Sequence, residues 1–248
     1  MLKKHNIEVL SASVRGALHK AKDLPCQDYC CAKHTANKLV AVVSDGAGSA
    51  RYSKTGAKLI CETLCNLLIK SKYENIEQEI IKAIDITRQK LIMHRLNKTK
   101  SESGLNNFAA TVVGVFYHNG RGIFFHIGDG AGIAFKQNEY DALIISEPEN
   151  GAFSCETYFY TMDNWQEALR FTGFENVDRI MLMTDGVTGF VFSDDFYKIR
   201  QNFLIPIVQY LENESQKKSA VKALENTLND ERAQHLNADD KTILWAKL

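Results

Sequence analysis

Apolar runs and helical stripes along the chain predict where its strands and helices lie. Residues 39–44 form a continuous apolar run, which is typical of a strand buried on both faces. A helical pattern starts near Ser53, with Ala57, Ile60 and Leu64 on one stripe. Further helices are predicted over 75–97, 195–211 and 215–229, and further strands over 108–117, 121–127, 131–135, 180–184 and 243–247.

The predicted strands cluster in the first and middle parts of the chain, with turn signals between them. Asn119-Gly120 separates two of the β-rich runs and is a strong hairpin signal, and Gly128-Asp129-Gly130 marks another tight turn. The polar stretch 98–107 is predicted to be a loop. Because the helices come in blocks instead of alternating with single strands, we expect an antiparallel α+β architecture.

Composition and charge narrow the class of protein. The 248 residues are 45% hydrophobic and 24% charged, which excludes wholesale disorder, and nothing marks a linker, so we expect a single domain over residues 1–248. The formal net charge is zero, which gives no overall field to attract nucleic acid or an acidic membrane surface. No run approaches the ~20 apolar residues of a membrane span, and no signal-peptide core follows the N-terminus. We therefore expect a cytoplasmic protein with no nucleic-acid or membrane partner.

Six cysteines occur, but a chain with this many core residues does not need a disulfide framework. Cys61 and Cys65 are four residues apart in a helical pattern, so we expect them to share a buried face. Cys26, Cys30 and Cys31 lack a second cluster of Cys or His at the spacing of zinc ligands, which favours small buried thiols over a zinc site.

Aspartates recur beside predicted strands and are the candidate chemical groups. Four of them stand next to Gly or Asp at a predicted strand end, and a fifth lies in a Pro-Cys-Gln-Asp segment: Asp45, Asp129, Asp185, Asp239 and Asp28. If these ends meet, their carboxylates could hold hard divalent cations such as Mg²⁺ or Mn²⁺. Asp-Gly is also a common turn dipeptide, and Asp129 could be part of a plain hairpin turn.

The order of these motifs resembles the metal-dependent type 2C (PPM) protein serine/threonine phosphatases, in particular their compact bacterial branch. The matching segments span almost the whole chain: Pro-Cys-Gln-Asp at 25–28, Val-Ser-Asp-Gly-Ala-Gly-Ser at 43–49, Phe-Ala-Ala-Thr at 108–111, His-Ile-Gly-Asp-Gly at 126–130, Met-Thr-Asp-Gly-Val at 183–187 and Asp-Asp-Lys-Thr at 239–242. Each segment alone is weak evidence for the family, but the whole set in this order is specific to it.

The resemblance implies a four-layer αββα sandwich of two antiparallel β-sheets flanked by helices. It also implies two Mn²⁺ or Mg²⁺ ions, a hydroxide that bridges them and attacks phosphorus in line, and no phosphoenzyme. By position, Asp45 would bridge both ions and the Gly46 carbonyl would bind one of them. The remaining aspartates would complete the site: Asp185 and Asp239 on the other ion, Asp28 mainly through metal-bound water, and Asp129 with Asp185 on a third, weaker ion.

The sequence departs from the family at two positions that matter for catalysis. Ala47 stands where many members have a His that is assigned as general acid. Asp23 stands where members usually place the Arg that binds the substrate phosphate. We expect His19, Lys22 or Arg15 to supply the positive charge for this phosphate, with His19 preferred because residues 16–19 resemble a Gly-x-x-His motif of the compact branch.

Other family differences are smaller. Asp240 replaces the usual Asn and is expected either to orient the last loop or to contact metal. Residues 147–178 correspond to a variable flap whose aromatics are expected to be mostly core. His126 is expected to pack or to titrate locally.

The leading hypothesis is a phosphatase acting on phosphoserine and phosphothreonine in a protein substrate, monomeric and paired with a Ser/Thr kinase. Two alternatives stay open. One is a non-catalytic pseudophosphatase that binds phosphoproteins, and the other is a metal-dependent hydrolase of a small phosphate ester.

Overall fold

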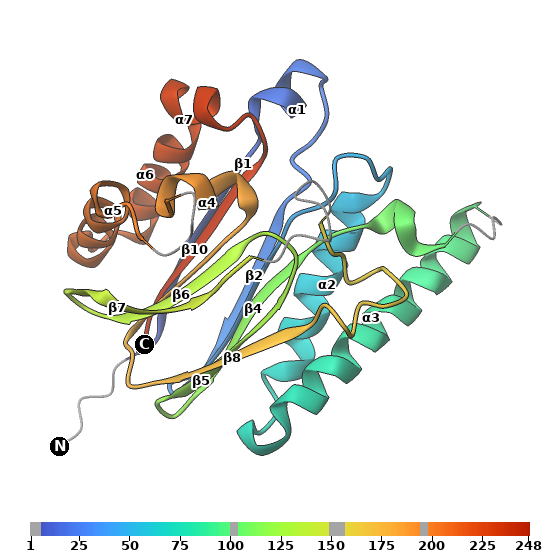
Figure 1. Cartoon of the computed structure of the whole chain (residues 1–248), viewed down its shortest axis with the longest axis horizontal. Helices are drawn as coiled ribbons and strands as arrows, with labels where there is room; N and C mark the ends of the chain where they lie inside the picture. The colour runs from blue at the N-terminus through green and yellow to red at the C-terminus, as the bar shows by residue number, and fades with distance from the viewer. Residues whose placement is uncertain (1–5, 100–103, 149–156, 194–197) are drawn as a thin grey trace.

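Two five-stranded antiparallel sheets form the centre of the computed structural model, which describes residues 6–99, 104–148, 157–193 and 198–248 (Figure 1). The first sheet has the order β1 (Glu8–Val14), β10 (Lys241–Lys247), β9 (Arg179–Met183), β6 (Ala131–Lys136) and β7 (Glu139–Ser146). The second has the order β2 (Tyr29–His34), β3 (Lys38–Ser44), β4 (Val112–His118), β5 (Arg121–Ile127) and β8 (Arg170–Glu175). The pairings are antiparallel in both sheets, as the pattern of strands and turns predicts.

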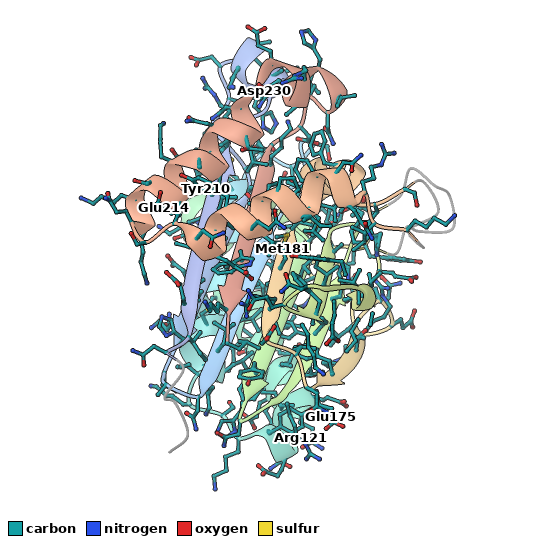
Figure 2. All side chains as sticks on the ribbon, turned by 90° about the vertical axis from the view of Figure 1, so that its left-hand side faces the viewer. Arg121, Glu175, Met181, Tyr210, Glu214 and Asp230 are labelled. Carbon is teal, nitrogen blue, oxygen red and sulfur yellow. The ribbon has the colours of Figure 1, made fainter. Side chains whose placement is uncertain are left out.

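Helices cover the outer face of each sheet. The second sheet is covered by α2 (Ser53–Leu68) and α3 (Ile76–Thr99), and the first by α4 (Asp185–Val191), α5 (Gln201–Asn213) and α6 (Lys217–Asn229). Two short helices, α1 (Ala17–Ala21) and α7 (Glu231–Leu236), lie at the same end of the molecule (Figure 1). Figure 2 looks onto the α5 side, where Tyr210 lies on α5, Glu214 directly follows the helix and Met181 lies in the sheet beneath it. These layers confirm the four-layer αββα sandwich.

The sandwich holds together through three apolar layers, and β3 shows how the sequence builds them. Leu39, Ala41 and Val43 face the other sheet, whereas Val40 and Val42 face the helical layer of α2 and α3. All five are fully buried, which confirms the prediction of a strand covered on both faces. Full burial of each Val or Leu side chain contributes roughly 1.5–3 kcal/mol, so the strand is fixed firmly at the centre of its sheet.

The two predicted turns behave differently. Asn119 and Gly120 have positive φ angles of 53° and 86° and close the β4–β5 hairpin, as predicted. The segment Gly128-Asp129-Gly130 joins β5 to β6, which lie in different sheets, so it carries the chain from one sheet to the other. The alternative of a plain hairpin turn at Asp129 is therefore wrong.

Several element boundaries differ from the predictions for local reasons. The predicted loop over 98–107 is partly helix, since α3 continues to Thr99 and a 3₁₀ turn occupies Leu105–Phe108. This turn delays β4, which begins at Val112 instead of at 108. Helix α5 begins at Gln201 instead of at 195, and residues 194–197 lie outside the described part of the chain. Strands β1, β2, β7 and β8 had no prediction, because edge strands are only half buried and lack a continuous apolar run.

Burial confirms the expected packing of thiols and flap aromatics only in part. Cys26, Cys30 and Cys31 are half-buried instead of buried, and so are Tyr158 and Phe159 of the flap. Cys61 and Cys65 are fully buried on the inner face of α2, and the five described cysteines are free thiols, while Cys155 lies outside the described residues. Tyr160 and Trp165 are core residues, whereas Phe153 also lies outside the described residues. None of the helices in the described ranges combines the length and apolar character that a membrane crossing needs.

Candidate metal centre and active site

The predicted aspartates meet at one end of the sandwich because of strand direction. In an antiparallel pair the start of one strand lies beside the end of its neighbour. Asp28 precedes β2 and Asp45 follows β3, and the register pairs Tyr29 with Ser44, so the two carboxylates emerge together. Asp185 and Asp239 are likewise brought together by the β9–β10 pair.

Asp129 completes the group from the segment that crosses between the sheets. It follows β5, whose other end carries the Arg121–Glu175 ion pair. Figure 2 labels this pair at the far end of the molecule from Asp230, near the start of α7. The aspartates therefore lie at the end of the molecule that also carries α1 and α7.

Three of these carboxylates lie close enough to one another to bind a single ion. Asp45, Asp129 and Asp185 each offer an oxygen, and these oxygens lie within 4.8 Å of one another. The charges of Asp28 and Asp239 also act on Asp45, so the structure brings all five predicted carboxylates together. One oxygen of Asp28, of Asp129 and of Asp185 is buried without a hydrogen-bond partner. Buried carboxylate oxygens that lack a hydrogen-bond partner within such a cluster fit a hard divalent cation.

The pKa values of the clustered carboxyl groups also fit a bound cation. Burial, followed by the charges of Asp28, Asp239 and Asp129, raises the pKa of Asp45 well above its ordinary value. Burial and the charges of Asp45, Asp129 and Asp239 do the same to the pKa of Asp185. Burial raises the pKa of Asp28 to about 7, against the opposing effect of hydrogen bonds from Thr242 and Thr184. A cation bound among them would remove this mutual repulsion.

These raised pKa values predict how the stability of the metal-free protein depends on pH. The pKa of Asp28 is about 7 in the folded chain against roughly 3.9 unfolded, so between these values the folded state binds more protons. The free energy of unfolding is therefore not reduced by Asp28 below about pH 4, where the carboxyl is protonated in both states. It falls as the pH rises from there through about 7, until Asp28 ionises in the folded chain as well. We expect the thermal midpoint to fall by about 5 °C from pH 5 to pH 8, since 1 kcal/mol corresponds to roughly 2–4 °C.

The measurement is differential scanning calorimetry of protein stripped of metal beforehand, with and without added Mn²⁺. Mn²⁺ should raise the midpoint more at pH 8 than at pH 5, because it replaces the protons on the carboxylates. If the thermal midpoint of the metal-free protein is the same or higher at pH 8 than at pH 5, the inferred repulsion among the carboxylates is wrong.

Threonines fix the backbone of Asp45 and the carboxylates of Asp28 and Asp129, and sequence reasoning did not assign them this role. Thr111 Oγ1 accepts a hydrogen bond from Asp45 N at 2.9 Å, and Thr111 N donates to the Asp45 carbonyl at 2.8 Å. Thr184 Oγ1 donates to Asp28 Oδ2 at 2.8 Å, and Thr157 Oγ1 donates to Asp129 Oδ2 at 2.6 Å. Thr111 and Thr184 stand inside matched motifs, which is the signal that could have found them, whereas Thr157 has no such signal.

Gly46 lies where the backbone is too crowded for a side chain. A Cβ there would lie 2.8 Å from the Gln27 carbonyl oxygen and 2.8 Å from the carbonyl carbon of Ser53. Gly46 also pairs with Ala110 in an isolated β-bridge, which fixes the chain directly after Asp45. The crowding explains why glycine follows Asp45; the role of its carbonyl as a ligand stays a prediction.

The residues predicted to bind substrate phosphate lie at the same end of the molecule. His19 is in α1, and its Nδ1 lies 2.7 Å from Asp240 Oδ2. Arg15 Nη1 donates to the Leu24 carbonyl at 3.1 Å and lies 3.6 Å from Asp23 Oδ1. The predicted role of each in binding phosphate stays a prediction.

His126 packs inside the sandwich, as expected. Its ring is fully buried, and Nδ1 lies 3.0 Å from Ser146 Oγ. Burial, together with the nearby charge of Arg170, lowers the pKa of His126 to about 3, so the ring is neutral at physiological pH.

The fold and the acidic cluster together define the class of protein. The protein phosphatase 2C family model matches residues 15–229, which is most of the chain. The chain therefore belongs to the protein phosphatase 2C family of serine/threonine protein phosphatases. It is 26% identical over 251 residues to serine/threonine-protein phosphatase 3 of Escherichia coli K12, covering 95% of this chain and 97% of that protein.

Solved structures of bacterial phosphatases share the fold. PppA of Pseudomonas aeruginosa, a key regulatory component of T6SS, superimposes with a TM-score of 0.67 at 14% identity, covering 98% of each chain. The catalytic domain of the serine/threonine protein phosphatase PstP, solved in complex with two manganese ions, gives a TM-score of 0.64 at 17% identity, covering 97% of each chain.

Proposed function

We propose that this protein hydrolyses phosphoserine and phosphothreonine in protein substrates with the help of Mn²⁺ or Mg²⁺. The observation that carries this proposal is the meeting of five carboxylates at one end of both sheets, with buried oxygens that have no hydrogen-bond partner. Membership of the protein phosphatase 2C family supports the same activity. A pseudophosphatase would have no physical reason to keep carboxylates that repel one another.

The carboxylates would share two ions and a third, weaker one. We assign Asp45 and the Gly46 carbonyl to the first ion, and Asp45, Asp185 and Asp239 to the second. Asp28 would act mainly through water, and Asp129 with Asp185 would hold the third ion. Bound ions of this kind lower the pKa of water and offset charge on a transferring phosphoryl group.

The residues of the chain orient this chemistry. Thr111 and Thr184 fix the backbone of Asp45 and the carboxylate of Asp28, so the reacting groups stay aligned. Water would attack phosphorus in line while the bond from phosphorus to the serine or threonine oxygen breaks; the proton lost by the water would end on that oxygen, so that phosphate and the free hydroxyl leave and no side chain forms a phosphoenzyme. His19, with Arg15 as the second candidate, would bind the phosphate oxygens of the substrate.

The partner is a phosphorylated protein, and a Ser/Thr kinase would supply this substrate, since the reaction consumes phosphoserine or phosphothreonine. The monomeric state, the cytoplasmic location and the single-domain organisation over residues 1–248 stay predictions.

The test is phosphate release from a phosphothreonine peptide by purified protein. We expect turnover with Mn²⁺, weaker or equal turnover with Mg²⁺, and loss of turnover with a chelator that excess Mn²⁺ reverses. A small ester such as p-nitrophenyl phosphate should be a poorer substrate than the peptide. The proposal fails if the metal-loaded protein releases no phosphate from the peptide.

A further inference from the structure

The carboxylate of Asp240 differs from the clustered aspartates because it is fully satisfied by hydrogen bonds. Its side chain is 1% exposed and accepts three short bonds. Gly16 N donates to Oδ1 at 2.7 Å, while Gln27 N at 2.6 Å and His19 Nδ1 at 2.7 Å donate to Oδ2. A buried carboxylate is costly unless paired, and three charge-assisted bonds provide that pairing.

These bonds join segments that are far apart in the sequence. Asp240 follows the proposed ligand Asp239, Gln27 precedes the proposed ligand Asp28, and His19 lies in α1. The Leu18 backbone N–H also donates to the Ala238 carbonyl at 3.0 Å. The start of α1 is therefore docked onto the loop that carries Asp239.

Gly16 makes this docking close. A Cβ at Gly16 would lie 2.2 Å from the carbonyl carbon of Asp239 and 2.4 Å from the carbonyl oxygen of Ala238. Only glycine allows the backbone to approach this near. The position of α1, and with it of His19, is thus set against the metal-binding loop by backbone contact as well as by the Asp240 carboxylate.

An amide could not replace Asp240 in this network. Both of its oxygens face N–H donors, whereas an asparagine would turn its NH₂ group toward one of them. The bond from Nδ1 also fixes the ring of His19, because Nδ1 must carry a proton to donate. Among the described residues no partner bonds the other nitrogen, Nε2, and the side chain keeps 10% of its surface exposed.

We propose that Asp240 is a positioning residue that holds the His19 ring so that Nε2 meets an oxygen of the substrate phosphate. This inference rests on the proposed phosphatase function. A ring protonated on both nitrogens donates Nε2–H to the phosphate while Nδ1–H stays on Asp240. Asp240 acts through His19, and the bonds from Gly16 and Gln27 keep the carboxylate in place.

The test uses variants that separate the two ring nitrogens. In His19→Asn the amide NH₂ can replace Nδ1 on Asp240, but nothing replaces Nε2. We expect His19→Asn to raise KM for the phosphothreonine peptide and the inhibition constant of inorganic phosphate about tenfold, with kcat changed less. Asp240→Asn should likewise raise KM and the phosphate inhibition constant more than it changes kcat. In the double variant, these two constants should be no higher than in the more impaired single variant.

A spectroscopic measurement separates positioning from general destabilisation. In ¹⁵N-histidine-labelled protein with Mg²⁺, the Nδ1–H proton of His19 should be visible in slow exchange and should disappear in Asp240→Asn. The signal is assigned by its absence in His19→Asn. His235→Asn, a change in the exposed last turn of α7, is the matched control and should leave KM and phosphate inhibition unchanged.

The outcomes distinguish this inference from the proposed function. If the wild-type protein shows no metal-dependent turnover, the proposed function fails. If the wild type is active but His19→Asn keeps its KM and phosphate inhibition, or the double variant shows additive losses, the role of the His19–Asp240 pair is overturned. Calorimetric titration with Mn²⁺ should show that His19→Asn binds the ion as the wild type does.

Discussion

Replacing Asp45 with Asn is expected to lower kcat/KM for a phosphothreonine peptide at saturating Mn²⁺ by at least about 10²–10³-fold. Asp45 shares the cluster with Asp129 and Asp185, and the charges of Asp28 and Asp239 also act on it. A neutral amide is a weaker ligand and offsets less charge on a divalent ion. Calorimetric titration should show weaker Mn²⁺ binding in parallel with the loss of turnover.

The same variant should be more stable than the wild type when both are free of metal. Burial and like charges penalise ionised Asp45, and the amide removes that penalty. We expect the thermal midpoint at pH 8 to rise by about 2–4 °C, which corresponds to roughly 1 kcal/mol in a chain of this size.

Asp163→Asn is the matched control, because this aspartate is fully exposed and outside the cluster. It should change neither turnover nor Mn²⁺ binding. Full activity of Asp45→Asn, or an equal loss in Asp163→Asn, would contradict the assignment of Asp45.

A single methyl group at Gly186 is expected to destabilise the fold by about 3 kcal/mol, at the upper end for overpacked sites. A Cβ there would lie 1.9 Å from the backbone carbonyl oxygen of Asp240, which cannot move without shifting β10. Gly186 directly follows Asp185, so the displacement should also weaken Mn²⁺ binding. Urea denaturation of Gly186→Ala and calorimetric titration with Mn²⁺ measure the two effects.

Gly189→Ala provides a control within the same short helix. Gly189 is exposed, and a Cβ there would meet no atom within 4 Å. Because Ala is a better helix former, this change should be neutral or should stabilise by up to about 1 kcal/mol. Equal stability of the two variants would show that the contact between α4 and the start of β10 is not rigid.

The sequence predicts the central strands and the acidic cluster well, for a physical reason. Strand β3 is apolar on both faces and could only be a covered strand, and the β4–β5 hairpin follows from Asn119-Gly120. The aspartates stand directly beside such strands, so their placement needs only the strand order. That order came from the family resemblance, since spacing alone does not show that the strand ends meet.

The parts that could not be predicted depend on contacts between distant segments. Thr157 reaches Asp129 from the flap region, and no local pattern marks it. The Asp240 network likewise joins residues more than 200 positions apart; its members stand in matched motifs, but the motifs do not show that these residues bond to one another. Edge strands such as β8 are half exposed, so their pattern is too weak to distinguish them from loops.

The chain passes from one sheet to the other at Gly128-Asp129-Gly130, so an ion bound at this end would hold the two sheets together. Asp28 and Asp45 belong to one sheet, Asp185 and Asp239 to the other, and Asp129 to the connection. An ion bound by aspartates of both sheets would link the two sheets directly. Any motion that slides one sheet past the other would then have to release the ion first. Amide hydrogen exchange in the strands that border the apolar layer between the sheets should therefore slow when Mn²⁺ is added.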